Sequence, residues 1–182
     1  MLRLIVTDAG DGPSEDHADW ADAQITCAAS PAVQYLSDRP WVSATNGWGP
    51  VELDASNGEE LAHDGGPINI NGVIYPKGLG THANATIVYD LNGACTRFAA
   101  DLGVDDEISG NLASVVFSIT GDGTVRYTSG TITPSSPTTS VSIDVTGVDQ
   151  LTLTVSDAGD GSGEDHADWA GARVTCTNGT LP

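Results

Sequence analysis

The chain has 182 residues and carries 25 acidic but only 6 basic side chains, which gives a formal charge of −19 at neutral pH. This imbalance argues against nucleic acids and anionic membrane surfaces as partners, because both are polyanionic. With 22 Gly, 9 Pro and no sustained helical spacing of apolar residues, the composition favours an all-β domain.

The first element along the chain is a segment that occurs twice. Residues 2–27 align with residues 151–176 at a constant offset of 157 − 8 = 149, and 18 of the 26 aligned pairs are identical. A repeat spacing of this length indicates one complete domain preceded by the end of another copy. The expected bounds are 1–27 for the duplicate of a terminal strand and acidic loop, 28–33 for a linker, 34–177 for the complete module and 178–182 for a tail.

Two tight turns mark hairpins in the module. Asn71-Gly72 interrupts the apolar residues of 68–75, and Asp122-Gly123 separates two further strand-like runs. Both dipeptides are typical of two-residue hairpin turns. The segment PKGLGTHA at 76–83, which follows the first hairpin, is interpreted as a turn because of its glycines.

Strand candidates then recur at regular spacing to the end of the module. They read TIVYDL, RFAADLG, SVVFSIT, TVRYTS, SVSIDVT, LTLTVS and ARVTC. The alternation of Val141, Ile143 and Val145 predicts an antiparallel sheet with one buried face. Trp169, in the run ADWA, is expected in the core. These features predict an all-β fold, an antiparallel β-sandwich of the jelly-roll type.

The three cysteines are Cys27, Cys95 and Cys176. Because Cys27 is the repeated copy of Cys176, Cys95 and Cys176 form the natural disulfide pair within the module, and Cys27 is left without a partner. The alternative is three buried thiols. A disulfide fits a secreted or extracellular protein, which is the localisation that we expect.

Four motifs resemble one known family. They are WVSATNGWGPVE, IYPKGLGTHA, the strand ends around GVDDE, and DAGDGxxxDHADWA, in that order between residues 35 and 176. Together they resemble the NPCBM family, carbohydrate-binding module family 51. The resemblance implies a β-sandwich of the galactose-binding-domain-like type, calcium in some members and binding of galactose-terminated glycans. It also implies a non-catalytic module attached to a secreted glycoside hydrolase.

Residues of three chemical kinds are candidates for contacting a sugar. Trp48 lies in the turn NGWGP and would offer a flat apolar face to a sugar ring, although packing within its loop is the simpler role. Histidines both donate and accept hydrogen bonds, and carboxylates at strand ends accept from neighbouring hydroxyls. Structural roles remain open for all of them. The carbohydrate-binding candidates are Trp48, Glu52, His82, Asp105, Asp106 and His166.

The acidic loop before Trp169 is a candidate metal site. Its carboxylates alternate with glycines, and calcium takes six to eight oxygen ligands from such loops. The spacing differs from that of an EF-hand. A solvated turn is the alternative, and a zinc site through Asp165 and His166 lacks a tetrahedral ligand set. The metal-binding candidates, with calcium as the expected ion, are Asp157, Asp160, Asp165 and Asp168.

The sequence therefore predicts a non-catalytic carbohydrate-binding module for galactose-type glycans, present as a tandem module in a secreted glycoside hydrolase or surface protein. The chain has no GxSxG elbow, no P-loop and no Cys–His pair once Cys95 and Cys176 are bonded, which argues against an enzyme. The alternative hypothesis is an assembly or adhesion repeat. In that case residues 2–27 would fill the place of residues 151–176, and the displaced copy would insert into the next molecule and give head-to-tail oligomers or fibres.

Overall fold

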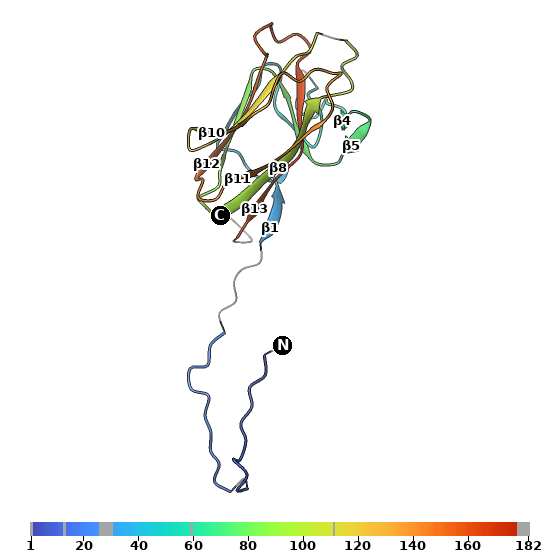
Figure 1. Cartoon of the computed structure of the whole chain (residues 1–182). Helices are drawn as coiled ribbons and strands as arrows, with labels where there is room; N and C mark the ends of the chain where they lie inside the picture. Colours follow the sequence, from blue (N-terminus) through green and yellow to red (C-terminus); the bar gives the residue numbers. More distant parts are fainter. Residues whose placement is uncertain (1, 13, 26–30, 59, 111, 178–182) are drawn as a thin grey trace.

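The structure is a computed structural model that describes residues 2–12, 14–25, 31–58, 60–110 and 112–177. We call residues 31–177 the module and residues 2–25 the arm. The module is a β-sandwich, and the arm extends away from it (Figure 1). The described residues contain only one short 3-10 helix, η1 (Leu36–Asp38), so none of their helices has the length and apolar character that crossing a membrane requires.

Two antiparallel sheets form the sandwich, as predicted. The six-stranded sheet consists of β1 (Ala32–Tyr35), β3 (Glu52–Leu53), β6 (Gly78–His82), β8 (Cys95–Val104), β11 (Thr139–Asp144) and β13 (His166–Cys176). The five-stranded sheet consists of β2 (Ser43–Thr45), β7 (Ala85–Asp90), β9 (Val116–Gly121), β10 (Thr124–Thr128) and β12 (Gln150–Ser156). A separate hairpin consists of β4 (Ile68–Ile70) and β5 (Val73–Tyr75).

Both predicted hairpin turns are confirmed. Asn71 and Gly72 connect β4 to β5 with φ values of 52° and 77°. Asp122 and Gly123 connect β9 to β10 with φ values of 50° and 74°. Positive φ at both central residues is the requirement of the type I′ turn, whose twist matches that of the flanking strands.

The last two strands occupy the centre of both sheets. β12 lies between β9 and β7, and β13 lies between β8 and β6, while its second half also pairs with β1. We call β12, the acidic loop and β13 (residues 150–176) the terminal arch, because its two strands stand on opposite sides of the core. Trp169 in β13 packs edge-on against Phe98 and Phe117, with ring centroids 6.3 Å and 4.9 Å away. Its predicted core position is confirmed.

The interpretation of PKGLGTHA as a turn is wrong, because residues 78–82 form the buried strand β6 between β13 and β3. The glycines there permit close packing. A Cβ at Gly80 would collide with the backbone of residues 55–57, which crosses directly over the strand. A glycine that allows backbone approach and a glycine that forms a turn look alike in sequence.

The chain ends meet at one edge of the module. β1 begins at Ala32, two residues before the expected start of the module, and Ala32 pairs with Cys176 at the end of β13. The predicted disulfide joins Cys95 to Cys176 with an S–S distance of 2.07 Å. Cys27, residues 28–30 of the expected linker and residues 178–182 lie outside the described residues.

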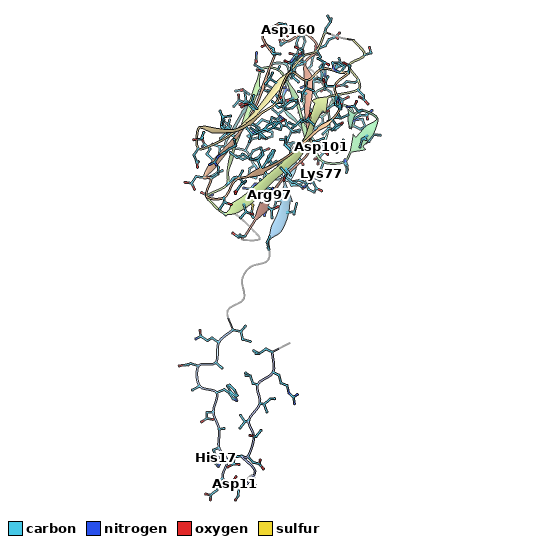
Figure 2. The ribbon with its side chains drawn as sticks, viewed as in Figure 1. Asp11, His17, Lys77, Arg97, Asp101 and Asp160 are labelled. Carbon is cyan, nitrogen blue, oxygen red and sulfur yellow. A yellow bond between two sulfur atoms is a disulfide. The ribbon has the colours of Figure 1, made fainter. Side chains whose placement is uncertain are left out.

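The arm is not inserted into the sandwich. Its described apolar side chains are solvent-exposed, and Asp11 and His17 lie at the tip where its two extended legs meet, far from Asp160 at the other end of the molecule (Figure 2). No named strand of the described residues pairs with it. Under the alternative hypothesis, residues 2–27 would take the place of residues 151–176. In this structure the terminal arch itself occupies that place, paired with β9 and β8.

Replacing Cys95 with Ser is expected to lower the free energy of unfolding by about 2–4 kcal/mol, because the bond links residues 81 positions apart and restricts the unfolded chain. Urea unfolding under non-reducing conditions measures the loss. Cys27→Ser is the matched control and should leave the unfolding midpoint unchanged. Equal midpoints for Cys95→Ser and the original chain would contradict a stabilising disulfide.

Candidate functional site

The loop that carries Trp48 is held by two asparagines. The side-chain Nδ2 of Asn46 donates to the carbonyls of Trp48 and Pro50, at 2.6 Å and 3.0 Å, and Asn57 donates to the same two carbonyls. The Asn46 Oδ1 accepts a hydrogen bond from the His82 amide at 2.8 Å. The loop is therefore fixed against the end of β6, and the Trp48 side chain stays 52% exposed.

Gly47 lets this loop approach β6. Its amide donates to the His82 carbonyl at 2.9 Å, and a Cβ at this position would collide with the Ala83 carbonyl. The sequence NGW thus combines an amide that ties the loop, a residue without a side chain and an exposed aromatic ring.

Two histidines lie beside Trp48. The ring of His82 is 6.2 Å from that of Trp48 and 5.1 Å from that of His166, which opens β13. His82 Nδ1 donates to the Ala83 carbonyl at 2.9 Å, and His166 Nδ1 lies 2.9 Å from Glu107 Oε1. These contacts fix the orientation of both rings, which is a requirement for directional hydrogen bonding to a ligand.

These residues line a groove with two halves. One half, of about 380 Å³, is bounded by Trp48, His82, Ile108, Ser162, Gly163, Glu164 and His166. The other half, of about 290 Å³, is bounded by Asn57, Gly58, Asp64, Gly65, Gly66, Glu107, Ile108 and His166. Since Ile108 and His166 belong to both, we treat them as one groove. It combines an indole face with imidazole and carboxylate groups.

Three of the predicted sugar ligands accept hydrogen bonds from backbone amides. Buried Glu52 accepts the His63 amide with both oxygens, at 2.9 Å and 3.0 Å. Buried Asp105 accepts the amides of Asn69 and Glu107, and Asp106 accepts those of Asn71 and Gly72 in the β4–β5 turn. None of the three lines either half of the groove. Of the six sugar candidates, the structure brings together Trp48, His82 and His166.

Sequence reasoning missed several groove residues. Glu107 directly follows Asp105 and Asp106 in the motif GVDDE, so the motif was found but its third acid was overlooked. Glu164 belongs to the acidic loop but was included neither among the sugar candidates nor among the metal-binding candidates. Asn57 comes from a loop in which no local pattern signals its contact with the Trp48 loop.

The acidic loop forms one cluster around Ser114. Both oxygens of Asp160 lie 2.9 Å from Ser114 Oγ, and Asp165 Oδ1 accepts the Ser114 amide at 2.8 Å. Asp165 Oδ2 is buried and accepts no hydrogen bond within the described structure. Burial raises the pKa of Asp165 to about 6, and the charges of Asp160 and Asp157 act in the same direction. A cation would relieve this concentration of negative charge.

Asp168 lies apart from that cluster. It is fully buried, both of its oxygens lack a hydrogen-bond donor among the described residues, and burial raises its pKa well above the ordinary value. After burial, the neighbouring Asp105 carboxyl is the next largest cause, and it also raises the pKa of Asp168. Two ionised carboxylates cannot bond to each other, so a bond between them requires that one is protonated.

The four predicted metal ligands therefore do not form one preassembled site. Within the described ranges, no three His, Cys, Asp or Glu side chains are placed to hold a common ion. Asp157, Asp160 and Asp165 share the loop, whereas Asp168 faces Asp105. The acceptor that fits a hard cation best is the unpartnered Asp165 Oδ2, because calcium prefers carboxylate oxygen.

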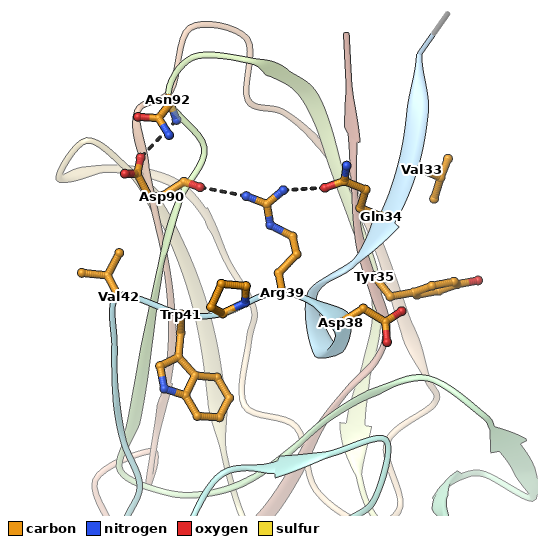
Figure 3. A pocket seen from close by; sticks show the side chains of 10 residues that line it. Val33, Gln34, Tyr35, Asp38, Arg39, Trp41, Val42, Asp90 and Asn92 are labelled. Atoms are coloured by element: carbon orange, nitrogen blue, oxygen red, sulfur yellow. Dashed lines mark hydrogen bonds between the residues drawn. The ribbon is translucent and has the colours of Figure 1, made fainter. Parts of the chain in front are cut away.

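A separate hollow of the module lies at the other end of β7, beside Asp90 (Figure 3). It has a volume of about 560 Å³ and includes Tyr35, Trp41 and Arg39. Arg39 donates to the Gln34 side chain at 2.5 Å and to the Asp90 carbonyl at 2.9 Å, so its guanidinium connects β1 to the end of β7. We assign this hollow a structural role, because its one cation is engaged in holding strands together.

Comparison with known proteins identifies the family. The model of the NPCBM/NEW2 domain matches residues 32–175, which is most of the chain. The chain belongs to this family. The resemblance found in the sequence motifs is thereby confirmed, and the matched range coincides with the β-sandwich.

Solved structures of the family share the fold. The CBM51 module of Clostridium perfringens GH95, in complex with methyl-galactose, is 35% identical, covers 79% of this chain and 99% of that one, and has a TM-score of 0.70. The CBM51-2 and INT domains of Clostridium perfringens ZmpB, in complex with GlcNAc, are 29% identical over 80% of this chain and 32% of that one, with a TM-score of 0.71. The module is a carbohydrate-binding module of this type.

A curated relative comes from Renibacterium salmoninarum, and its name assigns it to the endo-alpha-N-acetylgalactosaminidases. It is 38% identical over 151 residues, which is 81% of this chain but 10% of the relative. The NPCBM chain thus corresponds to a small part of that protein.

Gly47→Ala is expected to displace the Trp48 loop from β6 and to lower the free energy of unfolding by about 1–3 kcal/mol, as overpacking does. Chemical denaturation and tryptophan fluorescence measure the two effects. Gly163→Ala is the matched control, because no atom lies within 4 Å of a Cβ at that position. Equal stability of both variants would show that the close approach at Gly47 is unimportant.

Proposed function

We propose that the groove beside Trp48 binds the terminal galactose-type sugar of a glycan. The observation that carries this proposal is the meeting of an exposed indole face with two oriented histidines in one groove. The indole would stack on the C–H face of the ring, and the polar groups of His82, His166 and Glu107 would contact its hydroxyls. Binding, without any bond being made or broken in the sugar, is the activity that we assign.

The galacto configuration suits such a groove. Its axial 4-hydroxyl leaves the C–H bonds at positions 3, 4 and 5 on one side of the ring, where they form an apolar patch for an aromatic face. The GH95 module was solved with methyl-galactose, and the Renibacterium relative is named for a sugar with the same configuration at this carbon. The ZmpB module was solved with GlcNAc, whose 4-hydroxyl is equatorial, so the configuration must be tested directly.

The biological role would be to hold an attached activity near its glycan. A single sugar contact of this kind binds weakly, with a Kd of roughly 1 µM to 1 mM, and additional modules would raise avidity through effective concentration. Attachment to a glycoside hydrolase is supported by the Renibacterium relative. The Cys95–Cys176 disulfide supports an extracellular location, because such bonds persist in oxidising compartments.

Trp48→Ala is expected to weaken binding of methyl-galactose at least about tenfold, equivalent to about 1.4 kcal/mol, because the stacking face is lost. His82→Ala should weaken it as well. Isothermal titration calorimetry with methyl-galactose, methyl-glucose and GlcNAc measures both affinity and preference.

Trp20→Ala is the matched control, since Trp20 is 52% exposed, as Trp48 is, but belongs to the arm. It should retain the original affinity. Loss of binding in Trp20→Ala together with retention in Trp48→Ala would contradict the assignment of the sugar to the groove. Absence of binding to all three sugars would contradict the proposed function.

We also propose that the acidic loop binds calcium at Asp165. Calcium is the ion that the sequence predicts, but the proposed site uses fewer side chains than the four predicted acids. The unpartnered, buried Asp165 Oδ2 and the nearby charges of Asp157 and Asp160 support it. The ion would neutralise the loop that supplies Glu164 and precedes His166, and would thereby help to fix one wall of the groove.

Calcium at a hundredfold excess over its Kd is expected to stabilise the module by about 2.7 kcal/mol, since it binds only the folded loop. Thermal unfolding with calcium or with a chelator measures the shift. Asp165→Asn should abolish the response, whereas Asp168→Asn, outside the cluster, should keep it. The reverse pattern would move the ion to Asp168, and an unresponsive original chain would refute the proposal.

A further inference from the structure

Carboxylates lie on both halves of the groove. Asp64 and Glu107 border one half, and Glu164 borders the other. All three side chains are solvent-exposed. Because the two halves meet at Ile108 and His166, a sugar ring in either half would lie beside at least one of these carboxylates.

These carboxylates come from three loops, and two of them are held in place. Asp64 precedes β4, Glu107 follows β8 and Glu164 precedes β13. Asp64 Oδ2 accepts the amide of Leu61 at 2.8 Å, and Glu107 Oε1 lies 2.9 Å from His166 Nδ1. A charge that is already positioned loses little side-chain entropy when it meets a ligand, so these two acids are prepared for an electrostatic contact.

A buried asparagine adds an acceptor to the half that has two carboxylates. Asn57 borders this half and is 1% exposed. Its Nδ2 donates to the carbonyls of Trp48 and Pro50, whereas its buried Oδ1 accepts no hydrogen bond within the described ranges. Carboxylates also only accept hydrogen bonds, so this half favours a ligand that donates them. An ammonium group supplies three donors together with a positive charge.

The basic side chains lie away from the groove. All six Lys and Arg residues belong to the described ranges, and none of them borders either half. Arg97 pairs with Thr175 near the end of β13, whereas the groove residue His166 begins that strand. Lys77 and Arg97 lie toward the end at which the chain enters the module, and Asp160 lies at the other end (Figure 2). No Lys or Arg among the lining residues therefore neutralises the groove carboxylates.

We propose that the groove selects its sugar by charge: it binds a galactosamine with a free amino group more tightly than galactose, and it rejects a galactose-type sugar that carries a carboxylate or a sulfate. This inference rests on the proposed function, because it concerns the sugar that the groove would hold. An ammonium on the ring would meet acceptors and negative charge, while an acidic group would lie beside like charges. The effect reaches across the groove, since the Debye length is about 10 Å at 0.1 M salt.

Charge selection would also decide which glycans the module can bind. A glycan whose galactose is capped by an acidic sugar or a sulfate would place that acid beside the groove carboxylates. It would become a ligand only after hydrolysis removes the acidic group and leaves an uncharged terminal sugar. For such glycans, a hydrolytic removal of acidic caps is the class of reaction that must precede binding.

Three sugars of one configuration separate charge from shape. The methyl glycosides of galactose, galactosamine and galacturonic acid are titrated calorimetrically into the full chain, with calcium held constant, at about pH 7, where the amine is mostly protonated and the acid is ionised. In about 0.01 M salt, galactosamine should bind at least about threefold more tightly than galactose, and galacturonic acid at least about threefold more weakly. Both differences should shrink in about 1 M salt, where the Debye length is about 3 Å.

Glu164→Gln locates the source of the effect. It removes one groove charge, keeps the size of the side chain and should lower the ratio of the galactosamine affinity to the galactose affinity roughly twofold. Because the ratio is measured, a general loss of sugar affinity does not affect the result. Asp149→Asn is the matched control, since it removes an exposed charge directly before β12, whose other end leads into the acidic loop. It should keep the original ratio.

Equal affinities for the three sugars in low salt, or tighter binding of galacturonic acid, would overturn charge selection and leave the proposed binding of galactose intact. An equal change of the ratio in Glu164→Gln and Asp149→Asn would overturn it as well, since the net charge and not the groove would then be responsible. Binding of galactosamine without galactose would support charge selection but contradict the galactose assignment. Absence of binding to all three sugars would refute both.

Discussion

The module depends on one segment that supplies the middle strand of both sheets. In the terminal arch, β12 is central in the five-stranded sheet and β13 is central in the six-stranded one. Trp169 from β13 meets Phe117 from β9 across the sandwich at 4.9 Å, so the core is enclosed between the two legs of the arch. Without this segment the five-stranded sheet would separate into two parts and the six-stranded sheet into three, since β1 pairs only with β13. The apolar faces of both sheets would then be exposed to water.

The arch also positions the groove. His166 is the first residue of β13, and its pairing with His82 of β6 brings the two imidazoles together. At the other end of β13, Gly171 permits the bulge at which the strand leaves β6 and then pairs with β1. The same strand therefore connects the groove end of the module to the end at which the chain enters it.

Much of the fold was predictable because its signals are local. The turns at Asn71-Gly72 and Asp122-Gly123 require positive φ at two successive residues, and few sequences supply it. β6 was not predictable in this way, because its glycines serve the approach of a distant segment rather than a local bend. The disulfide was predictable from the repeat, which showed that Cys27 and Cys176 are copies of one position.

The site was only half predictable for a related reason. The motifs located Trp48, His82 and His166, whereas Glu52, Asp105 and Asp106 have backbone amides as partners. A sequence shows that an acid follows a strand, but its hydrogen-bond donors come from segments far away in the chain. Glu52 and His63 are eleven positions apart, and Asp105 and Asn69 are 36 apart.

These backbone-bound carboxylates give the acidic composition a structural meaning. Asp106 holds the β4–β5 turn through two amides, and Asp122 accepts the amides of Asp149 and Gln150 at the start of β12. Each such carboxylate closes a loop with charge-assisted hydrogen bonds, which are stronger than neutral ones. Loops held in this way lose little further freedom when a ligand binds. A groove that binds a ligand through few contacts needs that advantage, since the entropy of ordering its walls would otherwise offset most of the binding free energy.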